Sequence, residues 1–127
     1  MEFTMQDHGY EVELDFRNLM ISSDETKGVR PYVLLVSSVA GCSGLVLRKM
    51  LNKMRISFDD IAMSADVKRN PEEADRVEEI KLHFVITGKE ISEKKMKRAM
   101  ELTHKNCSMI QSVKDSIRIV ETYEIQP

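Results

Sequence analysis

Two cysteines are the residues of this sequence best able to carry chemistry. Cys42 and Cys107 lie 65 positions apart in a chain of 127 residues. A thiolate is a nucleophile and a ligand for soft metals, and two thiols together can form and break a disulfide. Their separation matches neither a CxxC motif nor the Cys/His spacing of a zinc site, so we expect no metal site. The pair is therefore expected to be either inert or redox-active.

Cys42 lies within the uncharged stretch VLLVSSVAGCSGLVL, residues 33–47. Burial in such surroundings raises the pKa of a thiol and leaves it inert, unless a cation or a hydrogen-bond donor is brought to it. One interpretation is a core residue, because free cysteines are among the most buried residues. The other is a reactive thiol, since Gly41, Ser43 and Gly44 let a small substrate or a partner element approach closely; close packing of two such helices would explain the glycines equally well.

Cys107 follows Asn106, where a short helix is predicted in CSMIQSVKDS. Unpaired amide groups and the helix dipole stabilise a thiolate at a helix N-terminus. From this local chemistry we expect Cys107 to be the more acidic of the two thiols. The alternative is a small apolar side chain that packs inward.

The histidines and serines are weaker candidates. His8, His83 and His104 have no spacing that suggests a shared metal; His83 is expected to face solvent from a strand, and His104 suits a helix C-terminus. Ser37 and Ser38 lack a G-x-S-x-G setting, so we expect them at a helix interface and not as nucleophiles.

The elements that must position the cysteines follow from the spacing of apolar residues. Pro31 suits the first turn of a helix, because its missing amide hydrogen would have no partner there. The predicted order is two or three strands within residues 2–23, a helix from Pro31 to about Met54, a hairpin of FDDIAMSADVKRN and RVEEIKLHFVITG, helices at ISEKKMKRAMELTHKN and CSMIQSVKDS, and a strand at IRIVETYEI. This order predicts an α+β fold in a single domain, residues 1–127.

The helix that begins at Pro31 is apolar on nearly every face over its first half, so we expect it to be buried on nearly all sides. One sheet from a chain of this length covers only one side of it. A second subunit is the natural cover. We therefore predict a homodimer in which the central helices, or the strands around them, are shared across a two-fold axis.

Charge and composition narrow the classes of partner. Nineteen basic and 21 acidic residues give a net charge of -2, which argues against nonspecific binding to nucleic acid. The segment MEFTMQDHGYEVELDF is acidic and alternating, unlike an export signal. The apolar run is shorter than the roughly 18 to 20 residues of a membrane span. We expect a cytoplasmic protein without a membrane segment.

Three segments together resemble the OsmC/Ohr superfamily of hydroperoxide-handling proteins, and within it the YhfA-like branch. They are RPYVLLVSSVAGC, the helix end near LNKMRI, and IKLHFVITGKEISEKKMKRAMELTHKNCSM. The resemblance covers the chain from about Gly28 onward. It implies an OsmC-like α+β subunit in an intertwined homodimer built around two central helices.

The resemblance also implies a chemistry. Cys42 matches the peroxidatic cysteine, which attacks a peroxide as a thiolate and becomes a sulfenic acid. Cys107 matches the resolving cysteine, which closes a disulfide that an external thiol reduces. Apolar surroundings imply organic hydroperoxides as substrates. Members with well-defined peroxidase activity also carry an arginine at the thiolate; Arg17 is the best match by location, and Arg30 is the second.

One departure from the family pattern separates two functional hypotheses. In those members a glutamate one or two positions after the helix-initial proline orients the arginine, and here these positions are Tyr32 and Val33. The first hypothesis is a thiol-dependent organic hydroperoxide reductase that needs no cofactor and acts in oxidative-stress defence. The alternative is a non-catalytic protein that binds a small apolar or electrophilic ligand at the dimer-interface pocket. A third possibility is a structural relic whose thiols are simply buried.

Overall fold

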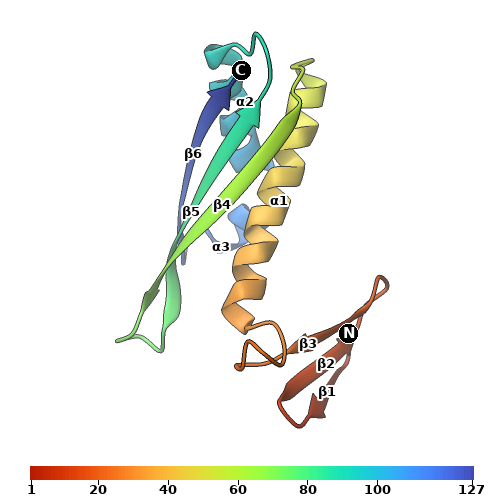
Figure 1. Ribbon diagram of the computed structural model, residues 1–127. Helices are drawn as coiled ribbons and strands as arrows, with labels where there is room; N and C mark the ends of the chain where they lie inside the picture. The colour runs from red at the N-terminus through yellow and green to blue at the C-terminus, as the bar shows by residue number, and fades with distance from the viewer. The chain divides into compact units, whose positions relative to one another are not determined.

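The computed structural model describes residues 1–127, which form two compact units: an N-terminal unit, Met1–Ser37, and a C-terminal unit, Ser38–Pro127. The elements in chain order are β1 (Phe3–Gln6), β2 (Gly9–Glu13), β3 (Asn18–Ile21), α1 (Pro31–Lys53), β4 (Asp60–Asn70), β5 (Arg76–Thr87), α2 (Glu93–Asn106), α3 (Ser108–Val113) and β6 (Arg118–Gln126). This mixed α+β fold of two sheets and three helices confirms the predicted fold class and element order (Figure 1).

The N-terminal unit is built on an antiparallel meander. The three strands pair in the order β1-β2-β3, in agreement with the two or three strands predicted within residues 2–23. Gly9 marks the first turn, where a Cβ atom would lie 1.9 Å from the carbonyl oxygen of Ile21. Only glycine fits this approach of one strand to the next. Val12 is buried in the unit, whereas Phe3, Met5 and Phe16 are exposed to solvent.

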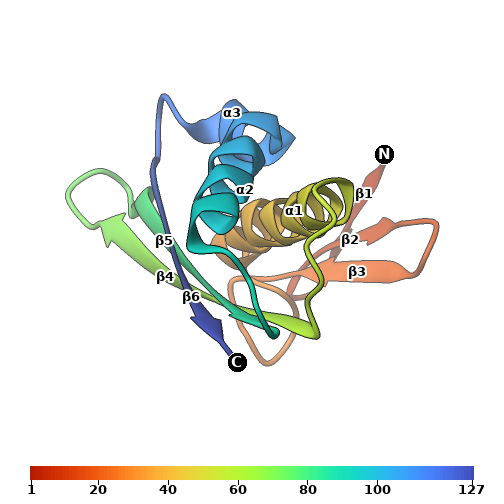
Figure 2. The same ribbon diagram turned by 90° about the horizontal axis from the view of Figure 1, so that it is seen from above.

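The C-terminal unit contains a second sheet with the order β4-β5-β6. β4 and β5 form the predicted antiparallel hairpin, whereas β5 and β6 are parallel. Parallel neighbours need a long crossover connection, and here α2 and α3 supply it. The alternation of β5 places Ile80, Leu82, Phe84 and Ile86 on the buried face. Figures 1 and 2 show α2 and the second half of α1 on one side of this sheet.

The two short helices meet at Cys107. Ser92 is the N-cap of α2, and its side chain accepts a hydrogen bond from the backbone N–H of Lys95. Met96 and Ala99 lie on the buried face of the helix. Cys107 is both the C-cap of α2 and the N-cap of α3. The turn that joins the helices therefore fixes the backbone of the second thiol.

Helix α1 begins at Pro31, as predicted, but the single chain does not bury it on nearly all sides. The side chain of Leu45 is 64% exposed, and a Cβ atom on Gly41 would meet nothing within 4 Å. By length and composition alone the helix could cross a membrane, which is weak evidence because the core helices of soluble proteins meet the same criterion. The expectation that the protein has no membrane segment therefore stays a prediction. Since Leu47 and Leu51 are fully buried, one side of α1 packs within its own chain.

Candidate functional site

The thiol pair comes together in the C-terminal unit. Cys42, in the middle of α1, is half-buried, and Cys107 is fully buried; both are free thiols. The Cys107 thiol donates a hydrogen bond to the Cys42 sulfur. The Cys42 Sγ also lies 3.7 Å from the Oγ of Ser108, the first residue of α3. A contact across more than sixty positions of sequence thus joins the two cysteines that the sequence singled out.

The surroundings of Cys42 favour its thiolate. Partial burial raises the pKa of this thiol, but four hydrogen bonds oppose burial and bring the pKa below its ordinary value. The donors are the backbone N–H of Met109, the Cys107 thiol, and the hydroxyl and backbone N–H of Ser108. Hydrogen bonds that a charged form accepts stabilise that form. Donors from the first turn of α3 therefore meet the condition under which a thiol in an apolar run is reactive.

The surroundings of Cys107 have the opposite effect. Burial, together with its role as donor to Cys42 and the negative charge on Cys42, raises the pKa of its thiol to about 11, although the backbone N–H groups of Ile110 and Met109 act in the opposite direction. The expectation that Cys107 is the more acidic thiol was therefore wrong. The cause is its position as a cap: its own N–H bonds to the carbonyl of Thr103 and closes α2. Of the next amides, that of Ser108 donates to Cys42, and that of Met109 is shared between the two sulfurs.

A buried carboxylate lies one residue from the thiol on α1. Ser43, which is fully buried, donates from Oγ to Glu121 Oε2 at 3.0 Å. His104 Nδ1 donates to Glu121 Oε1 at 2.7 Å, and the Glu121 side chain is only 8% exposed. Because the carboxylate stands between serine and imidazole, this is not a hydrolase triad, in which the imidazole stands in the middle to accept the serine proton. Glu121 instead connects α1, α2 and β6.

Our sequence interpretation missed Glu121 and Ser108, and it named Ser43 only as a small residue beside Cys42. A signal for Glu121 was present, because it alternates in phase with Ile119 and Tyr123 and therefore points to the same face of β6 as these residues. No comparable signal marked Ser108 as a neighbour of Cys42, since only the folded chain brings α3 beside α1.

The arginines suggested by the resemblance lie in the N-terminal unit. Arg17 is exposed and stacks on the ring of Phe16 at 4.9 Å, and Arg30 stacks on the ring of Tyr32 at the same distance. All four donors to the Cys42 sulfur come from the C-terminal unit. The assignment of Arg17 to the thiolate therefore stays a prediction.

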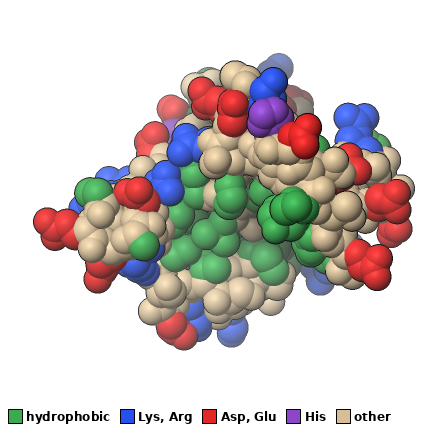
Figure 3. Space-filling view, turned by 90° about the horizontal axis from the view of Figure 1, so that it is seen from below, with side chains coloured by type: hydrophobic (Ala, Val, Ile, Leu, Met, Phe, Trp, Pro, Cys, Tyr) green, Lys and Arg blue, Asp and Glu red, His purple; other side chains and the backbone are tan.

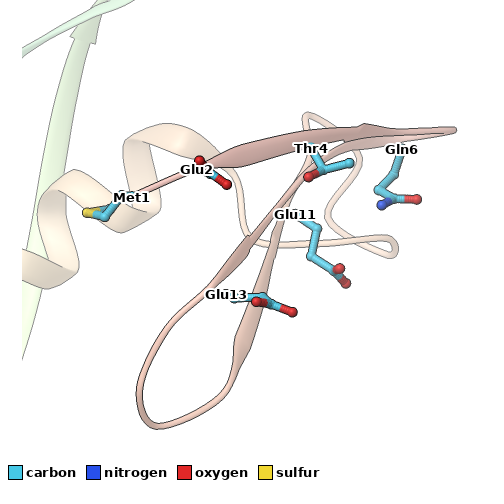
Figure 4. Close-up of a pocket in the computed structure, with 6 residues that line it drawn as sticks. All are labelled: Met1, Glu2, Thr4, Gln6, Glu11 and Glu13. Carbon is cyan, nitrogen blue, oxygen red and sulfur yellow. The ribbon is translucent and has the colours of Figure 1, made fainter.

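Two other pockets contain neither cysteine nor histidine. The first, on the N-terminal sheet, is lined by Met1, Glu2, Thr4, Gln6, Glu11 and Glu13 (Figure 4). The second is a groove of about 300 Å³ in the C-terminal unit between α1 and β4, lined by Gly41, Gly44, Leu45, Arg48, Ile61 and Met63. No group of three or more His, Cys, Asp and Glu side chains is placed to hold a metal ion. The thiol pair is thus the site with the clearest chemistry.

The profile of the OsmC-like protein family matches residues 23–122, which include both cysteines and most of the elements described above. The chain belongs to the OsmC-like family. The predicted resemblance to the OsmC/Ohr superfamily is thereby confirmed.

Individual relatives agree with this OsmC-like assignment. YhfA of Escherichia coli K12 is 26% identical over 108 residues, 84% of this chain and 81% of YhfA, in keeping with the predicted branch. A hypothetical protein from Aquifex aeolicus VF5 is 26% identical with a TM-score of 0.87, and the match covers 98% of this chain and 93% of that one. An organic hydroperoxide resistance protein OsmC from Legionella pneumophila has a TM-score of 0.74 over 98% of this chain and 97% of its own; at 15% identity it shows the fold alone.

Proposed function

We propose that this OsmC-like protein is a thiol-dependent peroxidase that reduces organic hydroperoxides through Cys42 and Cys107. The observation that carries the proposal is the contact of the two thiols, in which a buried Cys107 donates to a Cys42 sulfur whose pKa is lowered. A nucleophile of lowered pKa beside a second thiol is the arrangement that redox-active cysteines use. The organic hydroperoxide resistance protein of the same fold supports this substrate class.

The proposed reaction has three steps. The Cys42 thiolate attacks the terminal oxygen of the hydroperoxide, the O–O bond breaks, and the alkoxide takes up a proton and leaves as an alcohol, with Cys42 left as a sulfenic acid. The Cys107 sulfur then attacks the Cys42 sulfur, water leaves, and a disulfide forms. An external dithiol reduces this disulfide to two thiols and is itself oxidised. Since reducing thiols are abundant in the cytoplasm, we place the reaction there.

Treatment of the folded protein with tert-butyl hydroperoxide is expected to produce an intramolecular Cys42–Cys107 disulfide. Peptide mapping by mass spectrometry, with and without a reductant, measures it. Protein unfolded in urea is the control, because it lacks the hydrogen bonds that lower the pKa of Cys42. If neither the disulfide nor a sulfenic acid at Cys42 is found in the folded protein, the proposal is wrong.

The proposal includes a homodimer. In the C-terminal unit Leu45 is exposed beside Gly41, and a glycine inside a helix costs about 1 kcal/mol relative to alanine. No contact within the unit explains this glycine, whereas close approach of a second copy does. Figure 3 shows hydrophobic side chains gathered on one exposed face of the molecule. Exposed apolar patches of this kind mark interaction surfaces.

Light scattering after size-exclusion chromatography is expected to give the mass of two chains. The variant Leu45→Glu is expected to elute as a monomer, because a charge would have to be buried at the interface. Lys94→Glu on the exposed face of α2 is the control, and it should remain a dimer. A monomeric parent protein would contradict the predicted assembly.

The apolar groove between α1 and β4 supports a second candidate, a binding protein for a small apolar or electrophilic ligand. The groove has a volume of about 300 Å³, and Leu45 and Met63 line it. Parent protein that binds such a ligand but consumes no hydroperoxide would favour this alternative. Consumption that is lost on replacement of Cys42, with ligand binding retained, would favour the enzyme.

A further inference from the structure

The effects that set the pKa of Cys42 are burial and hydrogen bonds, and none of them is a nearby cation. Two of the donors are backbone amides, and one is the Cys107 thiol, which the proposed reaction consumes. The remaining donor is a side chain with no other role so far, the hydroxyl of Ser108. It is the one donor that is both a side chain and unchanged by the reaction.

We propose that Ser108 is a further catalytic residue, whose hydroxyl donates a hydrogen bond to the Cys42 sulfur and holds it as a reactive thiolate. The inference rests on the proposed function, in which that sulfur is the nucleophile. Oγ and Sγ are 3.7 Å apart, a distance at which either atom can donate. When Cys42 is ionised its sulfur can only accept, so the hydroxyl must be the donor.

The backbone on both sides holds Ser108 in this place. Its carbonyl accepts a hydrogen bond from the Oγ of Ser112 at 2.7 Å, within α3. On the other side, the backbone N–H of Cys107 is bonded to the carbonyl of Thr103 at 2.9 Å, which ties the turn to α2. The hydroxyl is thus presented to α1 by a turn fixed at both ends. A preorganised donor stabilises charge without a reorganisation of the site during the reaction.

The hydroxyl is not consumed, and no bond to it forms or breaks. Its effect is to raise the fraction of Cys42 present as thiolate at a given pH, while it makes each thiolate somewhat less nucleophilic. The nucleophilicity of a thiolate falls with its pKa with a Brønsted coefficient of about 0.4 to 0.5. The two effects have opposite signs, and they dominate in different ranges of pH. This opposition gives a test that a loss of folding does not mimic.

Ser108→Ala is expected to move the midpoint of the pH profile for Cys42 alkylation upward by about one pH unit. This is the lower end of the range of shifts expected for the loss of one hydrogen bond to a charged group. Below both midpoints the variant should react about three- to fourfold more slowly with iodoacetamide. Above both midpoints it should react about threefold faster, because its thiolate is the more basic one. Mass spectrometry of the Cys42 peptide gives the rate at each pH.

Ser108→Thr retains a hydroxyl and should restore the parent profile. The control is Ser64→Ala, which removes an exposed hydroxyl from β4 and has no part in holding Ser108, so it should leave the profile unchanged. Ser108→Gly is a second variant without the hydroxyl, for use if Ser108→Ala does not fold. An unchanged midpoint in a folded variant that lacks the hydroxyl overturns the inference, as does a shift of equal size in Ser64→Ala.

Alkylation does not require peroxide, so the two proposals fail separately. A shifted profile in a protein that consumes no hydroperoxide would support the role of Ser108 at the thiolate and contradict the peroxidase. Peroxide consumption with an unchanged alkylation profile would support the peroxidase and contradict the role of Ser108.

Discussion

Cys42→Ser is expected to reduce the consumption of organic hydroperoxide to the level of solution without protein. A serine hydroxyl is not ionised near neutral pH, and none of the hydrogen bonds offered to the Cys42 sulfur changes that. The matched variant, Cys107→Ser, makes the same replacement at the other thiol. It should reduce one equivalent of hydroperoxide and then stop, with a sulfenic acid at Cys42 that dimedone traps. Ferrous oxidation assays and mass spectrometry measure the two outcomes.

The two steps should also differ in their dependence on pH. Formation of the sulfenic acid should level off at the lower pH, because the pKa of Cys42 is below its ordinary value. Closure of the disulfide should keep accelerating toward a pH of about 11, because the pKa of the Cys107 thiol is raised to about 11 by burial and only its thiolate attacks readily. Consumption that survives in Cys42→Ser, or one common pH profile for both steps, would contradict these roles.

The elements of the fold were predictable because their signals are local. Pro31 starts α1, Ser92 caps α2, and the alternation of β5 sets its buried face. The extent of burial of α1 was not predictable in the same way, since the pattern of one helix does not say which chain covers it. Leu45 shows this: its apolar side chain predicted burial, and within the single chain it is exposed.

The chemistry of the site was only half predictable. The sequence identified both cysteines, but it assigned the lower pKa to Cys107 from the helix that this residue begins. In the structure the first turn of α3 also contacts Cys42, through the hydroxyl of Ser108, and Cys107 is the buried thiol of the two. A pKa depends on neighbours in space, so a contact between α1 and α3 reversed an argument from sequence position.

The chain has no glutamate at Tyr32 or Val33, but another carboxylate, that of Glu121, lies near the site. Glu121 does not touch the Cys42 sulfur, yet it holds the next residue of α1 through Ser43 and holds α2 through His104. We therefore expect its role to be in the stability of the packing that brings the thiol-bearing elements together, which gives a prediction of large effect.

Glu121→Ala is expected to lower the free energy of unfolding by about 2 to 4 kcal/mol, because the fully buried hydroxyl of Ser43 loses its acceptor and a cavity remains. Ser43→Ala removes that hydroxyl as well, so the double variant should be more stable than the sum of the single losses implies, by about 0.5 to 3 kcal/mol. His104→Ala should cost less, because its side chain is 45% exposed. Urea unfolding at one fixed protein concentration gives all four values. Strict additivity of Glu121→Ala and Ser43→Ala would mean that the hydrogen bond between them does not stabilise the fold, and that α1 is held beside β6 by its apolar contacts alone.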